Sequence, residues 1–172
     1  MKKQIRSNVF ETNSSSCHAI CISKNTVSKS DLPSHVTFAR GEFGWEGVEY
    51  CDVWSKASYL YEAILSCYYG HAEEKLNEIK QTLKQYNIEC DFEPKNNDWG
   101  YIDHGGNTID FVEAVLEDDD KLLTYLFGDG FIVTGNDNGS EFFHDRMYDE
   151  IDNYNYQLKS EFDNYDVYEK WN

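Results

Sequence analysis

The chain has 172 residues, 40% hydrophobic and 16% aromatic, which is enough for one buried core and one domain over residues 1–172. It carries 32 acidic residues against 15 Lys and Arg, a net charge of −17, which disfavours direct binding to nucleic acid and favours a basic protein partner. No stretch has the apolar length needed to cross a bilayer, so we expect no membrane association. An acidic protein without a charged partner is the simpler alternative, because net charge does not identify a ligand.

The cysteines indicate the compartment. Their number is odd, and no signal-peptide pattern precedes them, so a disulfide framework is not expected. We therefore predict a cytoplasmic protein. The five residues are Cys17, Cys21, Cys51, Cys67 and Cys90.

The segment from Arg6 to Ser23 is the first place to look for chemistry, because it sets a histidine among cysteines after a run of small polar residues. Its residues alternate: Ser16, His18, Ile20 and Ile22 share one side of a two-residue period, while Cys17, Ala19 and Cys21 share the other. This alternation predicts a strand that enters the core. The residues 13–16 favour a compact turn before it.

Four motifs, VFETNSSSCH, GEFGWE, YIDHGG and TGNDN, resemble those of a family of small phage and prophage proteins from low-GC Gram-positive bacteria. In that family a Thr often stands at the position of Cys17. The resemblance extends from the N-terminus to about Asn138 and implies an origin in a mobile element. Some acidic proteins of this size and source are anti-CRISPR inhibitors of Cas9, so the resemblance also implies a type II-A anti-CRISPR as a candidate function.

Strands and helices follow along the rest of the chain. The apolar periods and turn residues predict strands at His35–Arg40, Ile88–Phe92 and Trp99–Asp103, and helices at Ser55–Tyr69, Glu73–Tyr86, from Asn107 or Thr108, and from Glu117. The loop Gly41–Gly47 contains two large aromatic rings and two carboxylates. It either packs over the core or presents a site, and packing is the favoured alternative.

The C-terminal part of the chain combines a turn motif with an acidic block. The segments Phe131–Thr134 and Glu141–Phe143 flank GNDNG, which predicts a hairpin and lacks the full ligand set of an EF-hand. From His144 to Asn172 an apolar stripe at near-heptad spacing predicts a tail that is helical for at least its first half. The fold class expected is α+β, a single domain with a mixed or mostly antiparallel sheet packed by helices and an acidic helical C-terminal tail.

The tail is also the expected partner-binding surface. Its carboxylates are spaced like the negative charge of a phosphate backbone and are interleaved with tyrosines, as interface anchors are. A solvated helix face is the alternative. The residues proposed for partner binding are Asp145, Asp149, Glu150, Asp152, Tyr148 and Tyr156.

A metal site is the second functional candidate. His18 and His104 each lie at a strand end beside a polar turn, and a nearby carboxylate and thiolate complete a ligand set for Zn²⁺. Ordinary hydrogen-bonded histidines are the alternative. If a metal is present, we expect a structural zinc. The proposed ligands are His18, His104, Glu42, Cys17 and Cys51.

The acidic charge, together with the origin that the resemblance implies, predicts a phage-derived acidic inhibitor that is not an enzyme. It would bind a basic, nucleic-acid-handling host protein, such as Cas9 or its guide-RNA complex, and block nucleic-acid loading without touching nucleic acid directly. Two other classes stay open: a zinc-dependent hydrolase using His18, Glu42 and His104, and a structural or assembly protein of a prophage.

Overall fold

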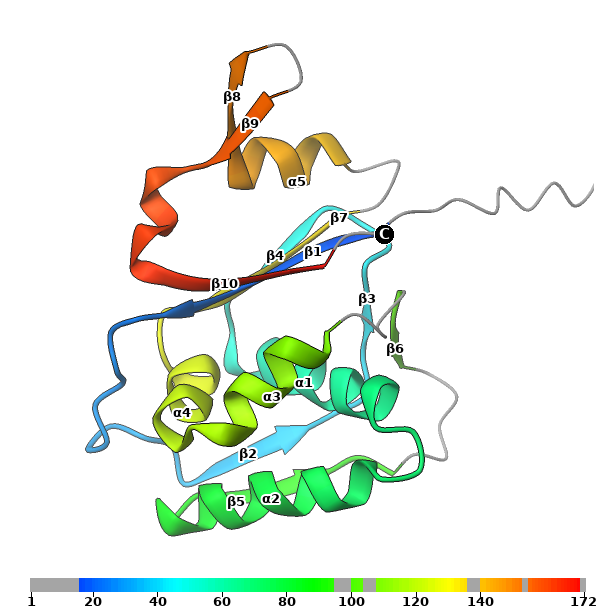
Figure 1. Ribbon diagram of the computed structural model, residues 1–172. Coiled ribbons are helices and arrows are strands. Elements are labelled where there is room, and N and C mark those ends of the chain that lie inside the picture. Colours follow the sequence, from blue (N-terminus) through cyan, green and yellow to red (C-terminus); the bar gives the residue numbers. More distant parts are fainter. Residues whose placement is uncertain (1–15, 95–99, 104–107, 136–139, 153–154, 171–172) are drawn as a thin grey trace, which may run out of the picture.

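The protein is built around a four-stranded antiparallel sheet with the strand order β10-β1-β7-β4 (Figure 1). The computed structural model describes residues 16–94, 100–103, 108–135, 140–152 and 155–170. The strands of this sheet are β1 (Cys17–Ser23), β4 (Val48–Tyr50), β7 (Phe131–Gly135) and β10 (Tyr165–Lys170).

The central strand β1 is buried along its whole length, as its alternating sequence predicts. Ile20 and Ile22 point into the larger core cluster, whereas Cys17, Ala19 and Cys21 point into a smaller cluster on the other face of the sheet. Because both faces of β1 are covered, each residue contributes apolar or hydrogen-bonding contacts to one of two layers.

Helices cover the first face of the sheet. They are α1 (Val53–Cys67), α3 (Ile109–Glu117) and α4 (Asp119–Phe127), and they enclose the larger cluster (Figure 1). Helix α1 begins two residues earlier than predicted, because Asp52 is the N-cap and accepts a hydrogen bond from the backbone N of Ser55 at 2.8 Å. The ends of the helices that the apolar spacing predicted otherwise agree with the structure to within about two residues.

The lower layer combines one helix with a short parallel strand pair. Helix α2 (Ala72–Gln85) packs beside β5 (Glu89–Phe92), which pairs with β2 (His35–Phe38). A second parallel pair joins β3 (Glu42–Phe43) to β6 (Tyr101–Ile102). The fold is therefore mixed α+β, which confirms the predicted class.

The C-terminal region differs from its prediction. Residues 141–143 lie in α5 (Ser140–Met147) and do not pair with β7, so the predicted hairpin is wrong. The helical tail is also wrong beyond Met147: β8 (Tyr148–Asp152) and β9 (Asn155–Leu158) form an antiparallel hairpin, followed by the 3₁₀ helix η2 (Ser160–Asn164) and β10.

The helical prediction for the tail failed because its last apolar residues also follow the two-residue period of a strand. Tyr165 and Val167 pack against the smaller cluster, whereas Tyr168 packs against the larger one. Pairing with β10 also satisfies backbone groups of β1 that would otherwise be buried without partners. Burial on two faces therefore outweighs the helical spacing.

Candidate partner-binding surface

A pocket of about 300 Å³ lies between α5 and the β8–β9 hairpin, which projects beyond α5 away from the main sheet (Figure 1). We call it the acidic pocket, and it is lined by Glu141, His144, Asp145, Tyr148, Glu150 and Tyr156. Four of these residues were predicted from the sequence to bind a partner. The structure thus gathers most of that predicted set, although the element that carries it is a helix and a hairpin.

The other two predicted residues lie on β8 next to the pocket. Asp149 is exposed but does not line the pocket, since neighbouring residues of a strand point to opposite sides. Asp152 ends the strand, and its side chain lies outside the described set. Glu141 and His144 were missed, because the sequence predicted a strand at Glu141 and gave His144 no partner.

Helix α5 positions the pocket through its buried side. Phe143 and Met147 are fully buried in the smaller cluster with Cys17 and Cys21, so the opposite side of the helix faces outward. The ring of His144 lies 5.1 Å from that of Tyr156 and 5.9 Å from that of Tyr148, measured between centroids. The pocket therefore has aromatic walls as well as carboxylates.

Tyr148 links the hairpin to the main sheet. Its hydroxyl donates a hydrogen bond to Glu169 on β10. Burial, together with the neighbouring Glu169, raises the pKa of the Tyr148 hydroxyl, which stays neutral and remains a donor.

The carboxylates around the pocket are not neutralised by the chain. Within the described residues, the side chains of Glu141, Asp145, Asp149 and Glu150 make no hydrogen bond or ion pair. The guanidinium of Arg146, also on α5, instead binds Glu49, at 2.5 Å from Nε, and Glu161. Lys159 donates to the backbone carbonyl of Asp145 and not to its carboxylate.

A second pocket with aromatic and acidic lining residues lies at the loop Gly41–Gly47. In the loop Gly41–Gly47, Phe43 packs in the core, as the favoured alternative predicts, while Trp45 is 53% exposed. A Cβ atom at Gly47 would lie 2.8 Å from the ring of Phe142 on α5, so this loop touches the helix that carries the acidic pocket. The loop therefore packs against α5 at Gly47 and Phe142.

The predicted metal ligands are separated in the structure. His18 is buried on the side of β1 that faces α1, and Cys17 is buried on the other side. Cys51 and Glu42 are exposed, and His104 lies outside the described residues. In the described part of the chain, no three His, Cys, Asp or Glu residues gather in a group that could hold a metal ion. Zinc binding stays a prediction, and elemental analysis of protein purified without chelators tests it.

His18 has the surroundings of a hydrogen-bonded core histidine. Its Nδ1 lies 2.9 Å from the hydroxyl of Tyr59, which is itself fully buried and whose pKa is raised by that burial. Gly44, at φ +106°, passes directly over the ring: a Cβ atom there would lie 2.7 Å from Nε2 of His18 and 2.9 Å from Cβ of Asp103. The hydroxyl of Ser16 donates to the carbonyl of Asp103 at 2.9 Å.

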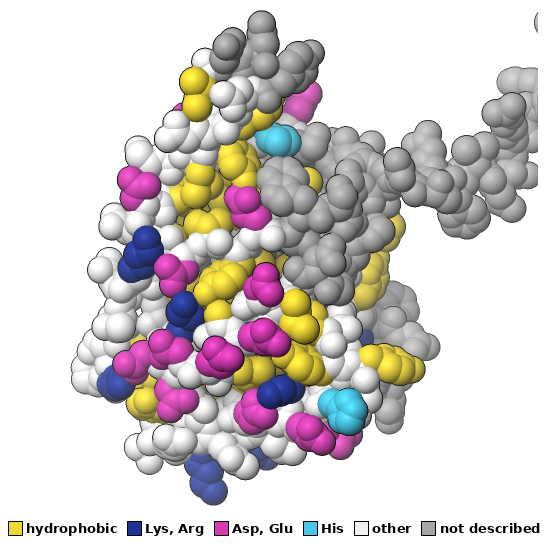
Figure 2. Space-filling model, viewed as in Figure 1, with side chains coloured by type: hydrophobic (Ala, Val, Ile, Leu, Met, Phe, Trp, Pro, Cys, Tyr) yellow, Lys and Arg dark blue, Asp and Glu magenta, His cyan; other side chains and the backbone are white. Residues whose placement is uncertain are grey.

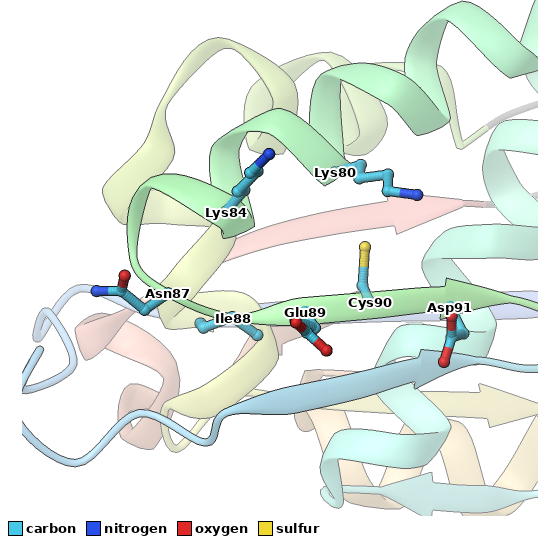
Figure 3. Close-up of a pocket in the computed structure, with 7 residues that line it drawn as sticks. All are labelled: Lys80, Lys84, Asn87, Ile88, Glu89, Cys90 and Asp91. Carbon is cyan, nitrogen blue, oxygen red and sulfur yellow. The ribbon is translucent and has the colours of Figure 1, made fainter.

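A groove of about 540 Å³ along β5 has a different character (Figure 3). Lys80 and Lys84 extend from α2, Cys90 points from β5 toward α2, and Glu89 and Asp91 point away from that helix. Among the described strands, none pairs with the outer edge of β5. Charged side chains beside an open edge protect it from pairing with other chains, and this mixed lining does not favour a basic ligand.

Comparisons of the chain with models of protein families, with curated proteins and with solved structures gave no match. No helix in the described residues is long and apolar enough to span a membrane.

Proposed function

We propose that this protein is an inhibitor that binds a basic, nucleic-acid-handling protein through the acidic pocket and prevents it from loading nucleic acid. The observation that carries the proposal is the set of exposed carboxylates around the pocket that make no ion pair within the described residues. The resemblance in the sequence motifs makes Cas9, with or without its guide RNA, the first partner to test. The protein would then act in the cytoplasm of the host cell and by occupancy, without turnover.

The physical basis is complementarity of charge with aromatic anchoring. Carboxylates that are not already paired lose no internal ion pair when a Lys or Arg side chain approaches. Tyr148 and Tyr156 add ring surface against which the apolar stem or the charge of such a side chain packs. The net charge of −17 would accelerate encounter with a positive surface, most strongly at low salt.

The first experiment separates the local pocket from net charge. Asp145→Asn, Asp149→Asn and Glu150→Gln together change the net charge from −17 to −14. Glu73→Gln, Glu74→Gln and Glu78→Gln on α2 make the same change far from the pocket. We expect the first triple variant to slow association with Cas9 by about tenfold at low salt and the α2 triple variant to slow it much less. Equal effects from the two triples would contradict a local site.

The second experiment tests the mechanism. Purified protein is titrated into a Cas9 cleavage assay, and it is added either before or after the guide RNA and the target DNA. A competitor of loading should inhibit completely near one molecule per Cas9, and inhibition should fall when nucleic acid is loaded first. Complete inhibition far below equimolar amounts would indicate turnover. No inhibition at any ratio or order would remove Cas9 as the partner.

A further inference from the structure

A pocket of about 370 Å³ next to the loop Gly41–Gly47 has the lining of a site for an organic cation. We call it the tryptophan pocket. Three aromatic rings, those of Trp45, Tyr50 and Tyr101, share it with the carboxylate-bearing residues Glu42 and Glu46. The described residues that line it include no Lys or Arg.

The rings are arranged as a corner. Trp45 and Tyr101 meet at 89° with their centroids 6.1 Å apart, and Trp45 is 53% exposed. Tyr50 is half-buried and held edge-on by Phe43, at 5.3 Å between centroids. Aromatic faces attract cations through the quadrupole of the ring, most strongly for Trp. The partly exposed ring of Trp45 therefore meets the ring of Tyr101 at a right angle beside the pocket.

The backbone fixes this exposure of Trp45. Phe43 is buried as part of β3, and Gly44 then adopts φ +106° where it crosses His18 and Asp103. An L-residue rarely adopts that conformation, and its Cβ would clash with both side chains. The turn at Gly44 therefore directs the chain so that the second large ring of the loop lies at the surface.

We propose that the tryptophan pocket binds an arginine side chain of the basic partner. A guanidinium group is planar and weakly hydrated, so it stacks on an indole ring while its N–H groups donate to carboxylates. Glu42 and Glu46 are both exposed and supply such acceptors at the rim of the pocket. The same carboxylates repel phosphates and carboxylates, which excludes anionic ligands.

The inference rests on the proposed function for the identity of the protein that carries the arginine, but not for the chemistry of the pocket. Because Gly47 of the same loop packs against Phe142 on α5, a partner that fills the tryptophan pocket would lie near the helix that carries part of the acidic pocket. The two pockets would then recognise neighbouring basic residues of one surface.

The test uses a small probe and the whole protein. N-acetyl-arginine methylamide is titrated into ¹⁵N-labelled protein, and the indole and amide signals of Trp45 and Tyr101 are followed. The neutral isostere N-acetyl-citrulline methylamide and the lysine analogue serve as probes of charge and shape. We expect saturable shifts with arginine, weaker binding of lysine, and none with citrulline.

Two variants locate the binding. Trp45→Leu should weaken arginine binding about two- to fivefold or more, as loss of an exposed cation–π contact predicts, and Glu42→Gln with Glu46→Gln should weaken it further. Trp54→Leu is the matched control, since Trp54 is 56% exposed at the start of α1 and does not line the pocket.

Equal binding of citrulline or lysine, or an effect of Trp54→Leu as large as that of Trp45→Leu, would overturn the assignment. So would the absence of shifts with arginine. Arginine binding without inhibition of Cas9 would leave the pocket assigned and overturn the proposed target. Inhibition of Cas9 without arginine binding would support the proposed target and overturn the assignment of the pocket.

Discussion

Two acidic regions of this protein use their carboxylates in opposite ways. Figure 2 shows acidic side chains gathered over α3 and α4. There Asp118 caps α4 by accepting hydrogen bonds from the backbone N of Asp120 and of Lys121, and Asp120 pairs with Lys29 at 2.7 Å. Around the acidic pocket, the described carboxylates make no such contacts. Asp118 and Asp120 therefore stabilise the fold, whereas the described carboxylates of the acidic pocket are not paired within the described residues.

The comparison shows why a count of charges is a weak guide to function. Both regions contain runs of Asp and Glu, and the sequence alone predicted a binding role for the acids after Phe143. What distinguishes them in the structure is whether each carboxylate already has a donor. Substitutions that remove one carboxylate at a time should separate the two classes by their effect on stability.

The largest effect on the free energy of unfolding is expected from the substitution of a fully buried carboxylate. Glu62 on α1 is 1% exposed and accepts from Nε of Arg40 at 2.6 Å and from the backbone N of Gly41 at 3.1 Å. Glu62→Ala leaves the partly buried guanidinium of Arg40 without this counter-ion, so we expect a loss of about 3 kcal/mol in the free energy of unfolding, measured by urea denaturation.

A double substitution, Arg40→Met with Glu62→Leu, is the matched control. It removes both charges and retains apolar volume, so it should destabilise the protein less than Glu62→Ala does. A loss below about 1 kcal/mol for Glu62→Ala would mean that this ion pair does not hold the segment after β2 to α1.

The next largest effect is the pH dependence of stability that arises from Cys21 in the smaller core cluster. Burial raises the pKa of the Cys21 thiol from 9.0 to about 12; Arg146 opposes this shift, while Glu169 and Glu49 add to it. A pKa raised on folding gives stability that is fully present below pH 9.0 and is lost as pH rises toward the folded value. The unfolded chain ionises first, so by pH 10 the loss from this thiol should be about 1.4 kcal/mol.

Cys21→Ala should flatten the fall in stability between about pH 8 and pH 10, and Cys51→Ala, which removes an exposed thiol, should not. Denaturation curves at each pH measure the difference between the slopes. Parallel slopes for wild type and Cys21→Ala would show that the thiol ionises equally in both states.

The sequence predicted the parts of the fold in which one period dominates. The alternation in β1 and the helical spacing of α1, α2 and α4 all correspond to the faces that are buried. It predicted the strand β7 correctly and failed after it. There the residues of β10 fit a helical stripe and a strand equally well, and only pairing with β1 decides. It also favoured packing for the loop Gly41–Gly47, because no local pattern distinguishes the buried ring of Phe43 from the exposed ring of Trp45.

The sequence predicted most of the residues of the acidic pocket but not their arrangement. The acids and tyrosines after His144 were identified, since clustered charge with aromatic residues is visible in the sequence. Their arrangement around a pocket was not, because it depends on the turn from α5 into β8 and on the register with β9. The proposed ligands Cys17 and His18 were separated by the same strand alternation that the sequence predicted, which a ligand set chosen by residue type ignores.

The smallest expected effect contrasts one residue from each acidic region. Asp118→Ala removes the acceptor of two backbone N–H groups at the start of α4 and should cost about 1 kcal/mol, as loss of an N-cap does. Asp149→Ala removes an exposed carboxylate on β8 that makes no ion pair within the described residues, and we expect a change within about 0.5 kcal/mol. Asp118→Asn, which keeps an acceptor at the cap, should recover most of the loss. Urea denaturation of the three variants measures these differences. A cost for Asp149→Ala equal to that of Asp118→Ala would mean that the carboxylates near the pocket also stabilise the fold, and the distinction between the two regions would then fail.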